Sequence, residues 1–118
     1  MHHLTFYVDF ISPYAYLAFH QLPQVLNGLN YQVRYQPVLF GGLLQHHGQL
    51  GPVEVVGKRE WTYRQCLWLG RQLGIDLQLP AAHPFNPLPL MRLAIATSAE
   101  GFPERSVCDA LFKFVWAS

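Results

Sequence analysis

The sequence has little charge and no long apolar run, and each shortage excludes a class of protein. Only 13% of the 118 residues are charged, whereas 51% are hydrophobic, and this balance favours a packed core over disorder. The formal net charge is +1 with no basic stripe, so we expect no nucleic-acid partner. No apolar run is long enough to span a bilayer, so no membrane partner is expected. A chain of this length forms one domain or part of one.

Cysteines are also few. Cys66 and Cys108 lie far apart in the sequence, and their spacing fits neither a metal knuckle nor a redox pair. Met1 leads directly into an alternating pattern without the apolar stretch of a secretory signal, so we expect reduced thiols and a cytoplasmic protein. The adjacent His46 and His47 would point in different directions, and we predict no metal site.

The N-terminal third of the chain predicts a strand, a helix and a second strand. Residues 4–10 alternate apolar and polar side chains, as a half-buried strand requires. Ser12-Pro13 indicates a helix start, because serine caps helices well and proline is tolerated in the first turn. The helix is expected over 13–22, and residues 31–38 alternate again. Such a unit forms a right-handed crossover between parallel strands, with the site beyond their carboxyl ends, where Ser12 falls.

The remainder of the chain predicts helices separated by irregular segments. A glycine-rich loop is expected over 43–52. A long helix is expected from about Glu54 to Leu73, with Trp61 and Trp68 on its apolar face. The segments expected after it are a non-helical stretch with four prolines over 79–89, a helix over 88–99 and a helix from about Pro103 to the end of the chain.

Ser12 has a position with useful electrostatics. The N-terminus of a helix carries about half a positive charge and several free N–H donors, which together stabilise an anion. A thiol bound there would accept a hydrogen bond from the hydroxyl, and its pKa, normally about 8.5, would fall. Such a thiol is a nucleophile near neutral pH. A simpler interpretation stays open, because Ser-Pro is a common helix opening and a capping serine needs no catalytic role.

Residues 6–17, Phe-Tyr-Val-Asp-Phe-Ile-Ser-Pro-Tyr-Ala-Tyr-Leu, resemble the opening of 2-hydroxychromene-2-carboxylate isomerases and kappa-class glutathione transferases. Those proteins belong to the DsbA-like branch of the thioredoxin superfamily, so the resemblance implies a thioredoxin-like α/β fold. Its redox members read Cys-Pro-x-Cys at this junction, where Ser12 and Ala15 stand here, so dithiol exchange is not expected. In the glutathione-using members this serine contacts the glutathione sulfur, and the resemblance implies that role for Ser12.

Further segments continue the resemblance and imply other site residues. Residues 37–44 resemble the segment after the second strand in its kappa-like form, which implies that Phe40 binds substrate. Lys58 fits a lysine that approaches glutathione at the start of an inserted helical domain. In the proline-rich segment, Phe85 and Asn86 fit an aromatic residue and an asparagine that approach the substrate.

The resemblance also has two departures. Leu44 stands near a position where the isomerases have a basic residue implicated in holding the substrate carboxylate. The chain ends inside the helical insertion, before the strands that complete the thioredoxin core of the family. We therefore expect an N-terminal portion of such an enzyme, with residues 1–52 in the thioredoxin-like domain and residues 53–118 in the inserted helical domain.

The function that the resemblance implies is that of a glutathione-dependent isomerase. It would act on a small aromatic, conjugated substrate by reversible thiol addition, with glutathione as an unconsumed cofactor. A kappa-like transferase would instead release a glutathione conjugate. A third possibility is a non-catalytic module that self-associates, because two core strands leave a sheet edge and an apolar face uncovered. We expect a homodimer.

Overall fold

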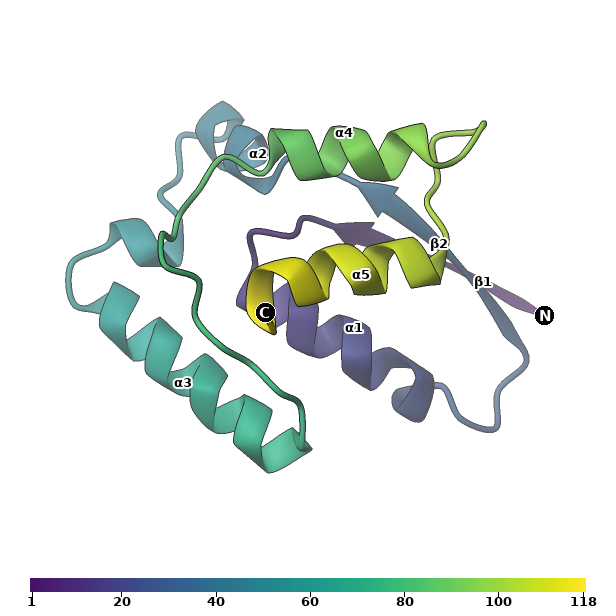
Figure 1. Cartoon of the computed structure of the whole chain (residues 1–118), viewed down its shortest axis with the longest axis horizontal. Helices are drawn as coiled ribbons and strands as arrows, with labels where there is room; N and C mark the ends of the chain where they lie inside the picture. The colour runs from purple at the N-terminus through teal and green to yellow at the C-terminus, as the bar shows by residue number, and fades with distance from the viewer.

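The structure is a computed structural model that describes residues 1–118, and it contains a two-stranded sheet and five α-helices (Figure 1). Strand β1 (His2–Val8) pairs in parallel with β2 (Tyr31–Pro37), and Val8 lies opposite Pro37. Helix α1 (Pro13–Val25) connects the two strands, which confirms the predicted strand–helix–strand unit. The sheet has no third strand, so one edge of each strand makes no backbone pairing. The predicted homodimer and the division at residue 52 stay predictions.

The remaining helices surround α1 and the sheet. Helix α5 lies between α1 and α4 and contacts both, while α3 packs against α1 (Figure 1). None of the helices combines the length and the apolar character that a membrane crossing requires. The elements that follow β2 are α2 (Phe40–His46), the short 3-10 helix η1 (Pro52–Glu54), α3 (Lys58–Leu73), α4 (Leu88–Ala96) and α5 (Arg105–Trp116).

Aromatic side chains form the centre of the core, where α1 and α5 meet the end of β1. The ring of Phe112 lies 4.9 Å from that of Phe10 and 5.1 Å from that of Phe19, measured between centroids, and all three side chains are fully buried. Trp116 is also fully buried and donates a 2.9 Å hydrogen bond from Nε1 to the Phe10 carbonyl. The core therefore holds in place the segment that leads from β1 to Ser12.

The segment predicted as a loop over 43–52 is helical in its first part, because α2 occupies Phe40–His46. Gly41 and Gly42 are poor helix formers, which is why the sequence pattern gave no helix there. The helix begins where the Phe40 amide donates a 2.8 Å hydrogen bond to Asp9 Oδ2. A contact between residues distant in sequence thus supports a helix that local propensity does not.

The start of α3 also differs from the prediction. The helix begins at Lys58, not near Glu54, because Gly57 adopts φ +83° and separates it from η1. Its end at Leu73, followed by Gly74 in the left-handed conformation, is confirmed. Among the other elements, β1 ends at Val8 rather than at residue 10, α1 continues through Pro23 to Val25, and α4 ends at Ala96 rather than at residue 99.

The buried face of α3 is not the one predicted. Trp61 and Trp68 are 57% and 58% exposed, whereas Thr62, Cys66 and Gly70 are buried. Small side chains allow the backbone of α3 to come close to its neighbours. A Cβ added at Gly70 would lie only 3.1 Å from the carbonyl oxygen of residue 75. Close packing, rather than hydrophobicity, therefore decides which face of α3 is buried.

Candidate functional site

Ser12 caps helix α1, as predicted. Its Oγ accepts a 3.1 Å hydrogen bond from the Ala15 amide, and its carbonyl accepts another from the Tyr16 amide. A hydroxyl has one donor proton and two acceptor lone pairs, so this capping bond leaves the proton of Ser12 free. The serine can therefore cap the helix and donate to a ligand at the same time.

A cavity of about 150 Å³ lies at the start of α1 and α2, next to Ser12. A volume of this size suits a short side chain more than a drug-sized ligand, whose sites occupy roughly 300–1,000 Å³. Ser12 and Phe40, both predicted as site residues, line this cavity. Its lining also includes Tyr14, Leu44, Thr62 and His83.

Asp9 joins the two chain segments that form the cavity. Its carboxylate accepts a 3.0 Å hydrogen bond from the Ile11 amide through Oδ1 and a 2.8 Å bond from the Phe40 amide through Oδ2. Burial raises the pKa of Asp9, and the two amide donors offset part of that rise. Asp9 contacts Ser12 only through its backbone carbonyl, at 3.3 Å from the Ser12 amide. Its role is therefore to fix the ends of both strands relative to each other.

His83 braces the same turn from the proline-rich segment. Its Nε2 lies 2.7 Å from the Ile11 carbonyl oxygen, and its Nδ1 lies 2.6 Å from the Tyr63 hydroxyl. A carbonyl oxygen only accepts, so Nε2 carries the proton and Nδ1 accepts from Tyr63. Burial lowers the pKa of His83, so the ring is neutral near neutral pH. The sequence does not mark His83 as a site residue, because no acidic residue lies at an informative spacing from it, whereas its partners in the fold are a carbonyl and a tyrosine.

Three of the predicted site residues do not line this cavity. Lys58 is exposed at the first position of α3, and Asn86 is exposed before α4, where its Oδ1 accepts from the Leu88 amide at 3.2 Å. Phe85 and Asn86 line a separate cavity of about 350 Å³ beside α5. His83 and Pro84 line the cavity beside Ser12, whereas Phe85 and Asn86 line the other one. Binding roles for Lys58, Phe85 and Asn86 stay predictions.

The protein's own thiols are unsuited to nucleophilic chemistry. Cys66 and Cys108 are fully buried and form no disulfide. Burial raises the pKa of each thiol to about 11, so both are protonated near neutral pH. The structure also gathers no group of three or more His, Cys, Asp or Glu side chains that could hold a metal ion. A thiolate at the cavity would therefore have to come from a ligand.

Comparisons with known proteins show the family and the fold. Residues 3–118 match the DSBA-like thioredoxin domain. The chain belongs to this family. Its fold is similar to a structure of selenomethionine-labelled 2-hydroxychromene-2-carboxylate isomerase, with a TM-score of 0.75 and 22% identity over 96% of this chain. The thioredoxin-like fold predicted from the sequence is thereby confirmed.

Sequence comparison also finds a relative of this chain. Over 78 residues, or 65% of its length, the chain is 26% identical to a Caenorhabditis elegans protein called glutathione S-transferase kappa 2. Both matched proteins are longer, and the chain covers 35% of the transferase and 56% of the isomerase chain.

Proposed function

We propose that this chain forms the thiol-binding part of a glutathione-dependent isomerase, in which Ser12 binds the glutathione sulfur. The observation that carries the proposal is the free hydroxyl proton of Ser12, which lies at the N-terminus of α1 and lines a cavity. The similarity to a protein called a glutathione transferase supports glutathione as the ligand. The fold shared with 2-hydroxychromene-2-carboxylate isomerase supports membership of the same structural group.

The residues around Ser12 fit the cysteine side chain of glutathione. The cavity holds about 150 Å³, enough for a thiol arm while the rest of the tripeptide lies outside. The Tyr14 amide stands in the first turn of α1, where backbone N–H groups have no acceptor within the helix. Together with the helix dipole and the Ser12 hydroxyl, it favours the thiolate over the thiol.

Bound glutathione would supply a thiolate that adds reversibly to a conjugated double bond, so that rotation about that bond becomes possible. Within the protein, Ser12 holds the sulfur by donating a hydrogen bond to it. The exposed ring of Phe40, on the cavity wall, offers an aromatic surface for the substrate. Asp9 and His83 hold the turn before Ser12 in place. Asp9 accepts from the Ile11 amide, and His83 bonds to the Ile11 carbonyl.

A kappa-like transferase is the second candidate, and Leu44 favours it. Leu44 lines the cavity, close to where the isomerases that the sequence resembles have a basic residue for the substrate carboxylate. An uncharged side chain at this position would accept aromatic electrophiles without a carboxylate. The two candidates differ in their product, because the transferase releases a glutathione conjugate whereas the isomerase returns free glutathione.

Calorimetry with glutathione tests the proposal, together with a pH titration of the ultraviolet absorbance of the bound thiolate. Ser12→Ala should weaken binding about tenfold, which corresponds to one lost hydrogen bond of about 1.4 kcal/mol, and it should raise the pKa of the bound thiol. Ser12→Asp keeps a good helix cap but places a negative charge beside the sulfur, so it should be stable and bind poorly.

Ser106→Ala, an exposed serine on α5, is the matched control and should bind like the wild type. The proposal fails if the wild-type chain does not bind glutathione. It also fails if Ser12→Ala and Ser12→Asp leave both the affinity and the thiol pKa unchanged.

A further inference from the structure

The outer edge of β1 carries backbone groups that have no partner strand. In a parallel pair, alternate residues of a strand turn their N–H and C=O groups toward the neighbouring strand. The His2 amide donates to the Asn30 carbonyl, and the Val8 carbonyl accepts from the Val38 amide, each at 2.9 Å. The even-numbered residues of β1 therefore face β2. Because the sheet has no further strand, the unpaired edge presents the N–H and C=O groups of His3, Thr5 and Tyr7.

This edge of β1 lacks the features that usually protect an exposed strand. Proteins blunt such edges with proline, with charged side chains or with a covering element. Strand β2 has such features, because Pro37 has no N–H to offer, Arg34 is charged and α4 contacts the strand. The seven residues of β1 include no proline, glycine, lysine, arginine, aspartate or glutamate, and the side chain of Tyr7 is 62% exposed. The edge of β1 is therefore suited to pairing with another strand.

We propose that this edge is an interaction surface for a second copy of the chain, and that the two β1 strands pair antiparallel with Thr5 opposite Thr5. Such a pair sets His3 of each copy opposite Tyr7 of the other, and it joins every outward N–H to an outward C=O. An antiparallel pair centred on Leu4 or Phe6 would instead oppose groups that already bond to β2. Because the strand is complementary to itself about its central residue, the partner that fits it is another β1.

The side chains of β1 agree with this register. Leu4 of one copy lies opposite Phe6 of the other, on the face turned to α1, where the Phe6 ring is 6.3 Å from the Phe19 ring. Leu4 is 37% exposed in the single chain, so the pairing buries apolar surface. On the opposite face, Thr5 meets Thr5. Cross-strand pairs of threonines, and of aromatic with apolar side chains, stabilise antiparallel sheets.

The pairing is independent of the function proposed for Ser12, because no residue of β1 lines the Ser12 cavity. Sedimentation equilibrium of the wild-type chain, from about 1 μM to about 1 mM, should show a dimer that forms as the concentration rises. A small interface without a covering element is expected to associate in this range rather than more tightly. A chain that stays monomeric throughout would show that a second copy is not the occupant of this edge, and the inference would be wrong.

The substitution Thr5→Lys tests which surface forms the dimer. It sets two cations opposite each other at the centre of the pair, beside Arg34, which lies opposite Thr5 in the sheet of each copy. Like charges in this position are destabilising, so the dissociation constant of the dimer should rise at least about tenfold. The matched control is Gln32→Lys, which adds the same charge at an exposed position of β2 on the same face and should dimerise like the wild type. Equal dimerisation of the two variants, both shown to be folded by circular dichroism, would contradict the proposal.

Disulfide cross-linking tests the register. In the proposed pair the two Thr5 Cα atoms are about 5.5 Å apart, within the roughly 4.4–6.8 Å that a disulfide spans. Thr5→Cys should therefore form a covalent dimer on oxidation in the absence of glutathione. His3→Cys, also exposed on this face, lies opposite Tyr7 and should cross-link much more slowly. The native Cys66 and Cys108 are buried and should not interfere. Equal cross-linking of both variants would show that the strands do not pair about Thr5.

Discussion

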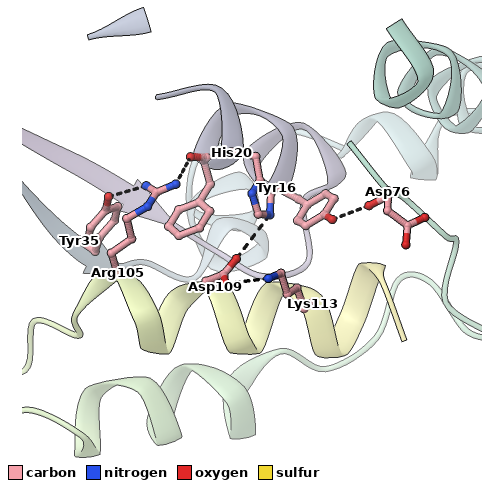
Figure 2. A network of polar contacts seen from close by, with 8 residues as sticks. Tyr16, His20, Tyr35, Asp76, Arg105, Asp109 and Lys113 are labelled. Atoms are coloured by element: carbon pink, nitrogen blue, oxygen red, sulfur yellow. Dashed lines mark hydrogen bonds and ion pairs between the residues drawn. The ribbon is translucent and has the colours of Figure 1, made fainter. Parts of the chain in front are cut away.

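Buried polar groups are bonded differently in two regions of the molecule. One region is the contact between α1 and α5, and the other is the cavity at the start of α1. In the helix contact, Arg105 donates to the Tyr35 hydroxyl at 2.7 Å and to the Phe19 carbonyl at 2.8 Å (Figure 2). Its guanidinium carbon also lies 3.9 Å above the centre of the Phe19 ring. Nearby, Asp109 accepts from Lys113 at 3.0 Å. The Arg105 guanidinium and the Asp109 carboxylate are thus paired around an aromatic core, whereas His20 Nε2, 3.6 Å from Asp109 Oδ1, has no hydrogen-bond partner.

At the cavity, the hydroxyl of Ser12 keeps a proton without an acceptor, and the buried carboxylate of Asp9 has only backbone donors. The helix contact is built for stability, whereas the cavity keeps hydrogen-bonding capacity that a ligand can use. Substitutions should therefore reduce stability most in the helix contact and binding most at the cavity.

The largest loss of stability is expected from Phe112→Ala in the helix contact. The side chain is fully buried against Phe10, Tyr16 and Phe19, and truncation of a buried phenylalanine costs about 3–5 kcal/mol. Urea unfolding followed by circular dichroism measures this loss. Phe114→Ala on the same helix is the control, because Phe114 is 65% exposed and should change little. Similar losses in both variants would contradict the assignment of the core.

A smaller loss of stability is expected from Arg105→Met. Methionine keeps much of the aliphatic length but removes the bonds to Tyr35 and Phe19, and hydrogen bonds to charged groups contribute about 1.5–3 kcal/mol. Arg92→Met, an exposed arginine on α4, should be nearly neutral in the same urea experiment. Equal stability of the two variants would mean that the arginine network in Figure 2 contributes nothing measurable.

At the cavity, His83→Leu should have a moderate effect on stability and a larger one on binding. Losing the bonds to Ile11 and Tyr63 should cost about 1–2 kcal/mol and loosen the turn that carries Ser12. His83→Gln can restore a donor to the Ile11 carbonyl, so it should recover part of the lost stability and part of the lost affinity. Hydrogen exchange at the Ala15 amide, which is bonded to Ser12, reports on the turn directly. Equal exchange in His83→Leu and the wild type would rule out the bracing role.

The sequence predicted those parts of the fold that depend on local patterns. Alternation in the first strand and the Ser12-Pro13 helix start were enough for the β1–α1–β2 unit, and Gly74 marked the end of α3. Helix α2 was missed because its support is the bond between Asp9 and the Phe40 amide. The buried face of α3 was missed because close helix packing selects small residues, whereas the hydrophobic pattern pointed to tryptophans.

The candidate site was only partly predictable for a related reason. Ser12 was found because it follows the carboxyl end of a strand, where parallel sheets place their sites, and Phe40 was implied by the resemblance of residues 37–44 to the family. His83 and Thr62 come from segments whose approach to Ser12 depends on tertiary packing.

The smallest expected effect concerns pH and the two histidines that belong to the two regions. Burial lowers the pKa of both His20 and His83 below their usual value. The unfolded chain therefore binds protons at about pH 6.5 while the folded chain resists them, so stability falls as the pH drops below about 6.5. At His20 the Asp109 carboxylate, 3.6 Å away, opposes the lowering of the pKa, and Arg105 and Lys113 add to it. At His83 the bond to the Ile11 carbonyl opposes the lowering, and the Arg59 cation adds to it.

His20→Gln and His83→Gln should therefore each remove part of the pH dependence. Urea unfolding of the wild type and both variants at about pH 7 and about pH 5 provides the comparison, and differences between variants cancel the titration of Asp9, whose raised pKa acts in the opposite direction. An unchanged pH dependence in one variant would mean that the burial of that histidine contributes nothing measurable, and it would identify the other region as the more pH-sensitive one. Because glutamine cannot be protonated, any pH dependence that survives both substitutions must come from other groups.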